Sequence, residues 1–142
     1  MTIKEIETEI IEEFETFGAD WEAKYEYLID MGKTLPMIEE KYKTESNIIK
    51  GCQSRVWLHS ELKEGKIYFT ADSDAIITKG LVALMVRVLS GHSPEEIMAA
   101  KLEFVDKIGL KEHLSPTRAN GLLSMIKQMK LDALAYKQRS IN

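Results

Sequence analysis

The stretch that decides the fold is "RVWLHSELKEGKIYFTADSDAIITKGLVALMVRVLSG", residues 55–91. In its first part Val56, Leu58 and Leu62 face one way and Trp57, His59 and Glu61 face the other, and "KIYFTA" alternates again after "KEGK". A period of two on both sides of a Gly-containing turn predicts a β-hairpin. The segment 75–89 follows a "DSD" that offers an N-cap, is apolar nearly all round, and is expected to be the buried central helix.

Helices are expected before the hairpin. Apolar residues at steps of three and four predict an amphipathic helix over 3–17, with its glutamates on the solvent side. Asp20 is the expected N-cap of a second helix, which Gly32 closes. The segment "KTESNIIKGCQS", residues 43–54, is rich in polar and turn-forming residues and is expected to be a loop.

Further helices are expected after the central one. Two Ser-Pro pairs, at 93–94 and 115–116, each provide an N-cap followed by proline in the first turn. Between them, "KLEFV" at 101–105 could supply a third strand. The order of helices, hairpin and helices predicts an α+β fold with a small antiparallel sheet, and the length of 142 residues fits a single domain over 1–142.

The composition is that of an ordinary globular protein, with 44% hydrophobic and 30% charged residues. A net charge of -4 without a basic stretch argues against nucleic-acid binding, because phosphate contacts need Lys and Arg. No apolar run is long enough for a membrane span, and the Glu-rich start does not resemble a targeting signal. A single cysteine fits a reducing compartment, so the expected location is the cytoplasm.

A metal site is not expected. The histidines, His59, His92 and His113, lack the short spacing that places two ligands on one helix face, and a single cysteine cannot form a thiolate cluster. A Gly-rich phosphate loop of either standard spacing is also missing from the sequence.

The candidate functional residue is Cys52, in "IIKGCQSRVW", residues 48–57. Its flanks are turn-like, and Gly51 permits backbone angles that are closed to other residues. Lys50 and Arg55 are expected to favour the thiolate, which is the nucleophilic form. A buried structural thiol is the alternative, because free cysteine is among the most buried residue types.

A solitary thiol restricts the possible chemistry. A reductase of the Cys-x-x-Cys kind needs a resolving cysteine, and a cysteine hydrolase needs an oriented His base, for which no local motif is present. What one cysteine can do unaided is accept an atom or group from another protein and pass it on. Persulfidation is one such reversible state.

Three ordered blocks of the sequence resemble the SufE/CsdE family, the sulfur-acceptor proteins of cysteine desulfurases. "IIKGCQSRVW" is similar to the active-site segment, "ADSDAIITKGLVALMVRVLSGHSPEEI" to the segment after the hairpin, and "LKEHLSPTRANGLLSMI" to the C-terminal segment. The likeness runs from "WEAKYEYLIDMGKTLP" to the last helix. It implies a compact α+β fold related to that of the IscU-like iron–sulfur scaffold proteins.

The resemblance implies a sulfur carrier. A pyridoxal-phosphate-dependent cysteine desulfurase of the SufS/CsdA kind would hold sulfur as a persulfide, Cys52 would accept it, and an iron–sulfur scaffold would receive it. Removing the persulfide would stimulate the desulfurase. The chain would need no cofactor of its own, since pyridoxal phosphate belongs to the partner, and turnover of a substrate by the chain alone is not implied. The cysteine loop of the family can tuck into a shallow apolar cavity and swing out.

The resemblance also marks three supporting residues. Gly51 precedes the acceptor, Asp74 matches a family acid close to the cysteine loop, and Arg118 matches a family arginine expected to help hold this region. Capping is the alternative for Asp74, at the start of the central helix, and for Arg118, in the first turn after Ser115. Two other functions stay open: a one-cysteine thiol peroxidase or transferase, and a non-catalytic desulfurase-binding module in which Cys52 is merely structural.

Overall fold

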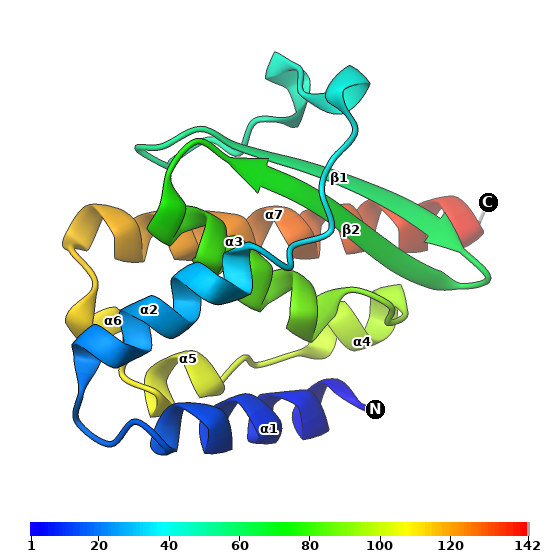
Figure 1. The fold of residues 1–142 in the computed structure, drawn as a ribbon. Coiled ribbons are helices and arrows are strands. Elements are labelled where there is room, and N and C mark those ends of the chain that lie inside the picture. The colour runs from blue at the N-terminus through cyan, green and yellow to red at the C-terminus, as the bar shows by residue number, and fades with distance from the viewer. Residues whose placement is uncertain (142) are drawn as a thin grey trace.

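The computed structural model describes residues 1–141, with side chains for 1–139, and shows a two-stranded antiparallel sheet packed against helices (Figure 1). The hairpin lies on one side of the molecule, α3 and α7 lie beneath it, and α1 lies on the opposite side (Figure 1). This arrangement confirms the predicted α+β class. The elements are α1 (Ile3–Glu15), α2 (Trp21–Gly32), η1 (Glu40–Tyr42), η2 (Glu45–Asn47), β1 (Val56–Lys63), β2 (Lys66–Ser73), α3 (Ile76–Leu89), α4 (Pro94–Ala99), α5 (Phe104–Lys107), α6 (Leu110–His113) and α7 (Pro116–Ile141).

The hairpin has the predicted turn. β1 and β2 pair along their whole lengths, and the last pair before the turn is Lys63↔Lys66. The two residues between them, Glu64 and Gly65, have φ angles of 51° and 79°. Left-handed angles at both central positions match the right-handed twist of the flanking strands, so this short connection fixes the register.

The predicted inward face of β1 is right at one end and wrong at the other. Val56 and Leu58 are buried, but Leu62 is 40% exposed. Its cross-strand partner Ile67 is nevertheless buried. The segment after α3 covers Ile67, whose N–H donates to the His92 carbonyl at 2.8 Å.

The central helix α3 is buried as expected, and its glycine explains how closely it packs. A Cβ on Gly80 would collide with the Leu28 carbonyl, so α2 and α3 approach each other backbone to backbone. The expected cap is wrong. α3 begins at Ile76 with Ala75 as its N-cap residue, and among the described residues no side chain forms a capping hydrogen bond at this end of the helix.

The possible third strand at 101–105 is also wrong. Leu102 has a φ of 56°, which interrupts an extended chain, and Phe104 already begins the short helix α5. Phe104 is fully buried, so the apolar run serves the core as one helical turn. In the described part of the chain the sheet has β1 and β2 alone.

Side-chain caps fix several helix starts as predicted. Asp20 Oδ1 accepts from the Ala23 N–H at 3.1 Å. Ser93 and Glu96 form a reciprocal capping box, with proline directly after the cap. The first helix ends at Glu15, two residues before the end of the predicted range 3–17, because the chain then enters a turn.

Some of the α1 glutamates, which were expected to face solvent, form contacts with α3. Arg87 of α3 donates to Glu9 Oε1 at 2.6 Å and to Glu13 Oε1 at 2.9 Å. Arg87 is partly shielded, with 29% of its side chain exposed, so this paired contact ties the first helix to the central one.

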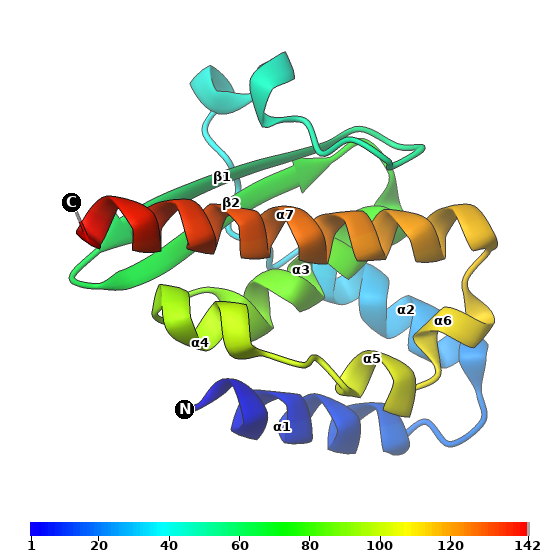
Figure 2. The same cartoon turned by 180° about the vertical axis from the view of Figure 1, so that it is seen from behind.

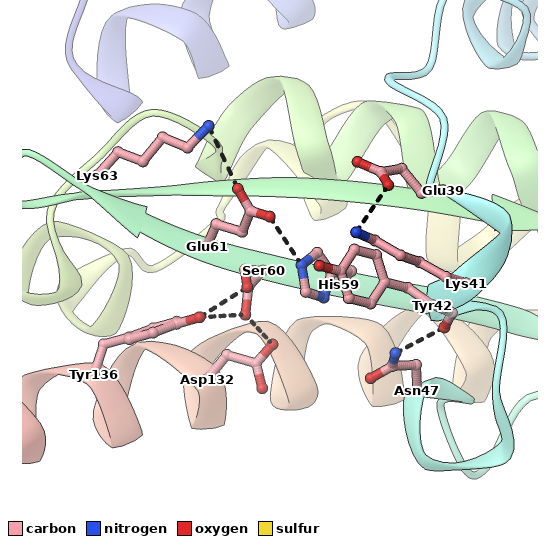
Figure 3. Close-up of polar contacts among 10 residues, drawn as sticks. All are labelled: Glu39, Lys41, Tyr42, Asn47, His59, Ser60, Glu61, Lys63, Asp132 and Tyr136. Atoms are coloured by element: carbon pink, nitrogen blue, oxygen red, sulfur yellow. Dashed lines mark hydrogen bonds and ion pairs between the residues drawn. The ribbon is translucent and has the colours of Figure 1, made fainter.

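The last helix, α7, runs along one face of the hairpin (Figure 2). Tyr136 donates its hydroxyl proton to the Ser60 carbonyl at 2.8 Å, and the Ser60 hydroxyl donates to Asp132 Oδ2 at 3.2 Å (Figure 3). These bonds attach the middle of β1 to α7. None of the described helices, the 26-residue α7 included, is both long and apolar enough to cross a membrane.

Candidate functional site

Cys52 lies at the tip of a loop whose stem is closed by backbone pairing. Ile48 and Trp57 form an antiparallel bridge, and the Ile49 N–H donates to the Val56 carbonyl at 2.8 Å. The residues between these positions form the turn that leads into β1. The structure therefore places the only thiol of the sequence on a short protruding turn, as the sequence predicted.

Gly51 is required by both its backbone angle and its neighbour. Its φ is 94°, in the left-handed region that side chains disfavour. A Cβ at this position would lie 2.5 Å from Ser124 Oγ of α7. The absence of a side chain therefore lets the loop rest directly on α7.

The thiol itself is half-buried against the same helix. Cys52 Sγ lies 3.5 Å from the Gly121 carbonyl oxygen, to which it donates a weak hydrogen bond. A Cβ at Gly121 would lie 3.5 Å from the sulfur, an ordinary van der Waals contact, so unlike Gly51 this glycine is not required by a collision. The structure thus shows the loop tucked in, with the sulfur between the loop and α7.

Burial decides the protonation of the thiol. It raises the pKa of Cys52, because the anionic form loses water that the helix backbone does not replace. The expectation that Lys50 and Arg55 favour the thiolate is wrong for this conformation. Both residues are exposed, and burial is the cause of the shift. At rest the thiol is protonated and sheltered.

A small cavity of about 60 Å³ opens beside Cys52. Leu81 and Met125 supply its apolar wall from α3 and α7, and Thr78 and Arg118 supply polar groups from the same two helices. The loop tip, the start of α3 and the first turns of α7 therefore meet at one place, although they are distant in sequence.

The structure places the other two predicted supporting residues, Asp74 and Arg118, next to this loop. Asp74 does not cap α3; its Oδ1 accepts from the Arg55 N–H at 3.1 Å, just beyond the thiol. Arg118 lines the cavity, and its backbone N–H donates to Ser115 Oγ at 3.3 Å. Arg118 thus takes part in the capping contact with Ser115 and also lies at the cavity.

The contributors from α3 and α7 that escaped the sequence analysis include Thr78, Leu81, Gly121, Ser124 and Met125. They belong to helices whose apolar pattern is explained by core packing alone. One local signal was present, the pair of small residues in "NGLLS" at the start of α7, which leaves the helix backbone open to a close approach.

The three histidines lie apart from one another. His59 stacks on Tyr42 at 3.6 Å between ring centroids (Figure 3), whereas His113 stacks on Trp21 at 3.8 Å. His92 is buried and contacts backbone carbonyls. Among the described residues no group of three or more His, Cys, Asp or Glu is placed to hold a metal ion.

A family model described as "SufE: Fe-S metabolism associated domain" matches residues 8–133. The chain belongs to the SufE family. Membership places it in iron–sulfur metabolism, and it agrees with the resemblance seen in the Cys52 segment and the two later blocks.

SufE-like relatives cover most of the chain. An uncharacterised SufE-like protein of Rhizobium meliloti (strain 1021) is 42% identical over 130 residues, which are 88% of this chain and 92% of that protein. One from Synechocystis is 38% identical over 128 residues, covering 90% and 80%. SufE-like protein 1, chloroplastic/mitochondrial, of Arabidopsis thaliana is 43% identical over 113 residues, covering 79% of this chain but 30% of the longer plant protein.

The fold also occurs in a solved structure. The solution structure of a hypothetical protein from Thermus thermophilus superposes with a TM-score of 0.76, covering 92% of this chain and 94% of that one. The sequence identity is 20%, so this likeness shows the fold alone.

Proposed function

We propose that the protein is a sulfur acceptor for a pyridoxal-phosphate-dependent cysteine desulfurase. Cys52 takes the persulfide sulfur, thereby stimulates the desulfurase, and delivers the sulfur to an iron–sulfur scaffold. The observation that carries this proposal is the position of the single thiol: it lies on a loop tip, held lightly against α7 beside a small cavity. SufE family membership supports the metabolic setting.

The transfer balances without an oxidant. The thiolate of Cys52 attacks the outer sulfur of the donor persulfide, a new S–S bond forms on Cys52, and the donor S–S bond breaks. The donor cysteine leaves as a thiolate and takes up the proton that Cys52 released. The same exchange on a recipient thiolate then passes the sulfur on and restores the Cys52 thiol.

The resting geometry suits a carrier more than a peroxidase. A peroxidatic cysteine must be a thiolate in the free protein, whereas burial raises the pKa of Cys52 and holds it in its protonated form. In a carrier the thiol needs to ionise only when a partner draws it out of the cavity. We therefore propose that binding of the desulfurase both exposes and activates Cys52.

Intact mass tests the proposal. The protein is incubated with a cysteine desulfurase, pyridoxal phosphate and cysteine, and its mass is measured with and without reductant. A reductant-labile gain of one sulfur atom on the wild type, absent in Cys52→Ser, is the expected result. Stimulation of the desulfurase that survives Cys52→Ser would instead support a binding module, and peroxide turnover without sulfur uptake would support a peroxidase.

Two expectations about the surroundings stay predictions. The chain is expected to hold no cofactor, because pyridoxal phosphate belongs to the desulfurase. A cytoplasmic location is proposed from the single cysteine, which fits a reducing compartment. The Arabidopsis relative is named for chloroplasts and mitochondria, so fractionation of the native organism is the deciding measurement.

A further inference from the structure

Thr78 is a buried polar residue that faces the thiol site. It lies near the start of α3, is 6% exposed, and lines the same cavity as Cys52. Among the described residues, no side chain or backbone group forms a hydrogen bond with the Thr78 hydroxyl.

The Thr78 hydroxyl therefore opens onto the cavity. In the described part of the chain every side-chain oxygen or nitrogen that is closed to solvent has a hydrogen-bond partner. An unpartnered hydroxyl must then keep some accessible surface, and the cavity is the space that Thr78 borders. A polar group held in this way, without a partner of its own, indicates a site that is completed by a ligand.

The size of the cavity limits that ligand. Its volume of about 60 Å³ exceeds the roughly 10–15 Å³ that a cavity needs to hold one water molecule. One additional sulfur atom on Cys52 fits this space, which is far smaller than the roughly 300–1,000 Å³ of a typical cofactor site. Leu81 and Met125 offer the soft apolar contacts that a sulfur atom prefers.

We propose that Thr78 binds the outer sulfur of the Cys52 persulfide by donating its hydroxyl hydrogen bond. This inference rests on the proposed carrier function and adds a binding residue to it. A persulfide loses its proton more readily than a thiol, so its outer sulfur is an anion at neutral pH. A half-buried anion needs a donor, because burial without one is costly. Arg118 lines the same cavity and adds a permanent positive charge.

The matched variants are Thr78→Val and Thr78→Ser. Valine keeps the shape and removes the hydroxyl, whereas serine keeps the hydroxyl and removes the methyl group. The persulfide is made chemically, so that the test does not need the desulfurase: Cys52 is first converted to a mixed disulfide with thionitrobenzoate, and sulfide then displaces thionitrobenzoate. This leaves Cys52–S–SH and releases a coloured thiolate that counts the loaded sites.

The readout is the rate at which cyanide removes the outer sulfur as thiocyanate, with intact mass as the check. Thr78→Val is expected to lose sulfur about tenfold faster than the wild type, because it lacks the hydrogen bond to the charged sulfur. Thr78→Ser keeps the hydroxyl, so its rate of sulfur loss is expected to stay near that of the wild type. Equal rates for wild type and Thr78→Val would overturn the inference, as would faster loss from both variants, which indicates a packing effect.

Folding and function are read separately. If Thr78→Val does not fold by circular dichroism, the pair Thr78→Ala and Thr78→Ser gives the same contrast in hydroxyl content. Suppose that Thr78→Val speeds sulfur loss from the chemically loaded protein, but the desulfurase does not transfer sulfur to Cys52. This result would support the sulfur site and overturn the proposed donor. If the desulfurase transfers sulfur to Cys52 but Thr78→Val does not change the rate of sulfur loss, the proposed donor is supported and the sulfur site is overturned.

Discussion

Asp74 and Arg55 are joined by two hydrogen bonds that run in opposite directions. Asp74 Oδ1 accepts from the Arg55 N–H at 3.1 Å, and the Asp74 N–H donates to the Arg55 carbonyl at 3.3 Å. The pair fastens the end of the Cys52 loop to the connection between β2 and α3. The side-chain bond can be removed by mutation, whereas the backbone bond remains.

Asp74→Ala is expected to loosen the Cys52 loop without unfolding the protein. Loss of one exposed hydrogen bond costs about 0.5–1.5 kcal/mol, so alkylation of Cys52 by iodoacetamide should become roughly 2- to 10-fold faster. Asp74→Asn is the control, because its amide oxygen still accepts from the Arg55 N–H. An alkylation rate in Asp74→Ala equal to that of wild type would show that this bond does not restrain the loop.

Gly51→Ala is expected to destabilise the protein by about 2–4 kcal/mol. The new Cβ meets Ser124 Oγ at 2.5 Å and also sits at a φ of 94°. Urea unfolding measures the change. Gly18→Ala is the matched control, since Gly18 has a φ of 58° with open space around it, and it should cost only about 1–2 kcal/mol.

The contribution of Ser124 can be isolated. Ser124→Gly in the Gly51→Ala background removes the colliding atoms and should restore part of the lost stability. If Gly51→Ala is no more harmful than Gly18→Ala, the loop does not rest on α7 in solution, and the tucked position of Cys52 is not the resting state.

Asp132→Asn is expected to stabilise the protein at neutral pH. Burial raises the pKa of the Asp132 carboxyl, although the Gln128 amide donates to its Oδ1. The Ser60 hydroxyl also donates to the carboxyl, at Oδ2 (Figure 3). A raised native pKa means that the stabilisation is present below the unfolded pKa and is lost as the pH rises through the native pKa. At neutral pH the wild type has lost it, so the neutral amide should raise the Tm by about 1–3 °C.

Thermal scans across pH check the Asp132 prediction. The advantage of Asp132→Asn should shrink as the pH falls through the native pKa of Asp132, because the wild-type carboxyl then becomes neutral as well. Asp30→Asn is the control, since the Asp30 side chain is 71% exposed. An advantage that does not change with pH would assign the effect to packing instead of charge.

The hairpin and the central helix could be predicted because local signals and tertiary packing agree there. Gly65 in the "EG" turn favours the positive φ that the short connection needs, and α3 is apolar nearly all round because it is buried on nearly every side. "KLEFV" failed because a short apolar run does not distinguish a strand from one buried helical turn. Leu102 at a φ of 56° decides between them, and no sequence pattern specifies that angle.

The position of the Cys52 site could be predicted from the sequence, but the effect of its surroundings on the protonation of the thiol could not. A lone thiol between turn-forming residues marked the loop, and the family blocks marked Asp74 and Arg118. Lys50 and Arg55 are close in sequence yet exposed, while the groups that bury the sulfur come from α7, 69 positions away at Gly121. Contacts at that separation depend on helix packing, which a single sequence does not encode in any local pattern.

The native Cys52 thiol is expected to ionise at a higher pH than the same thiol in the unfolded chain. Burial raises its pKa, so the native state holds its proton to higher pH. The resulting contribution to the free energy of unfolding is complete below the unfolded pKa and is lost as the pH rises through the native pKa. Iodoacetamide reacts with the thiolate, so at pH 7 native protein should be alkylated several-fold more slowly than protein in urea.

The pH profile of alkylation distinguishes burial from local charge. In native protein its midpoint should lie above the midpoint measured in urea, and Asp74→Ala should move it back toward the unfolded value by freeing the loop. A native midpoint below the unfolded one would mean that Lys50 and Arg55 control the thiol after all. Addition of a desulfurase whose active-site cysteine is mutated should raise the native rate at pH 7, if the partner draws Cys52 out of its cavity before sulfur is transferred.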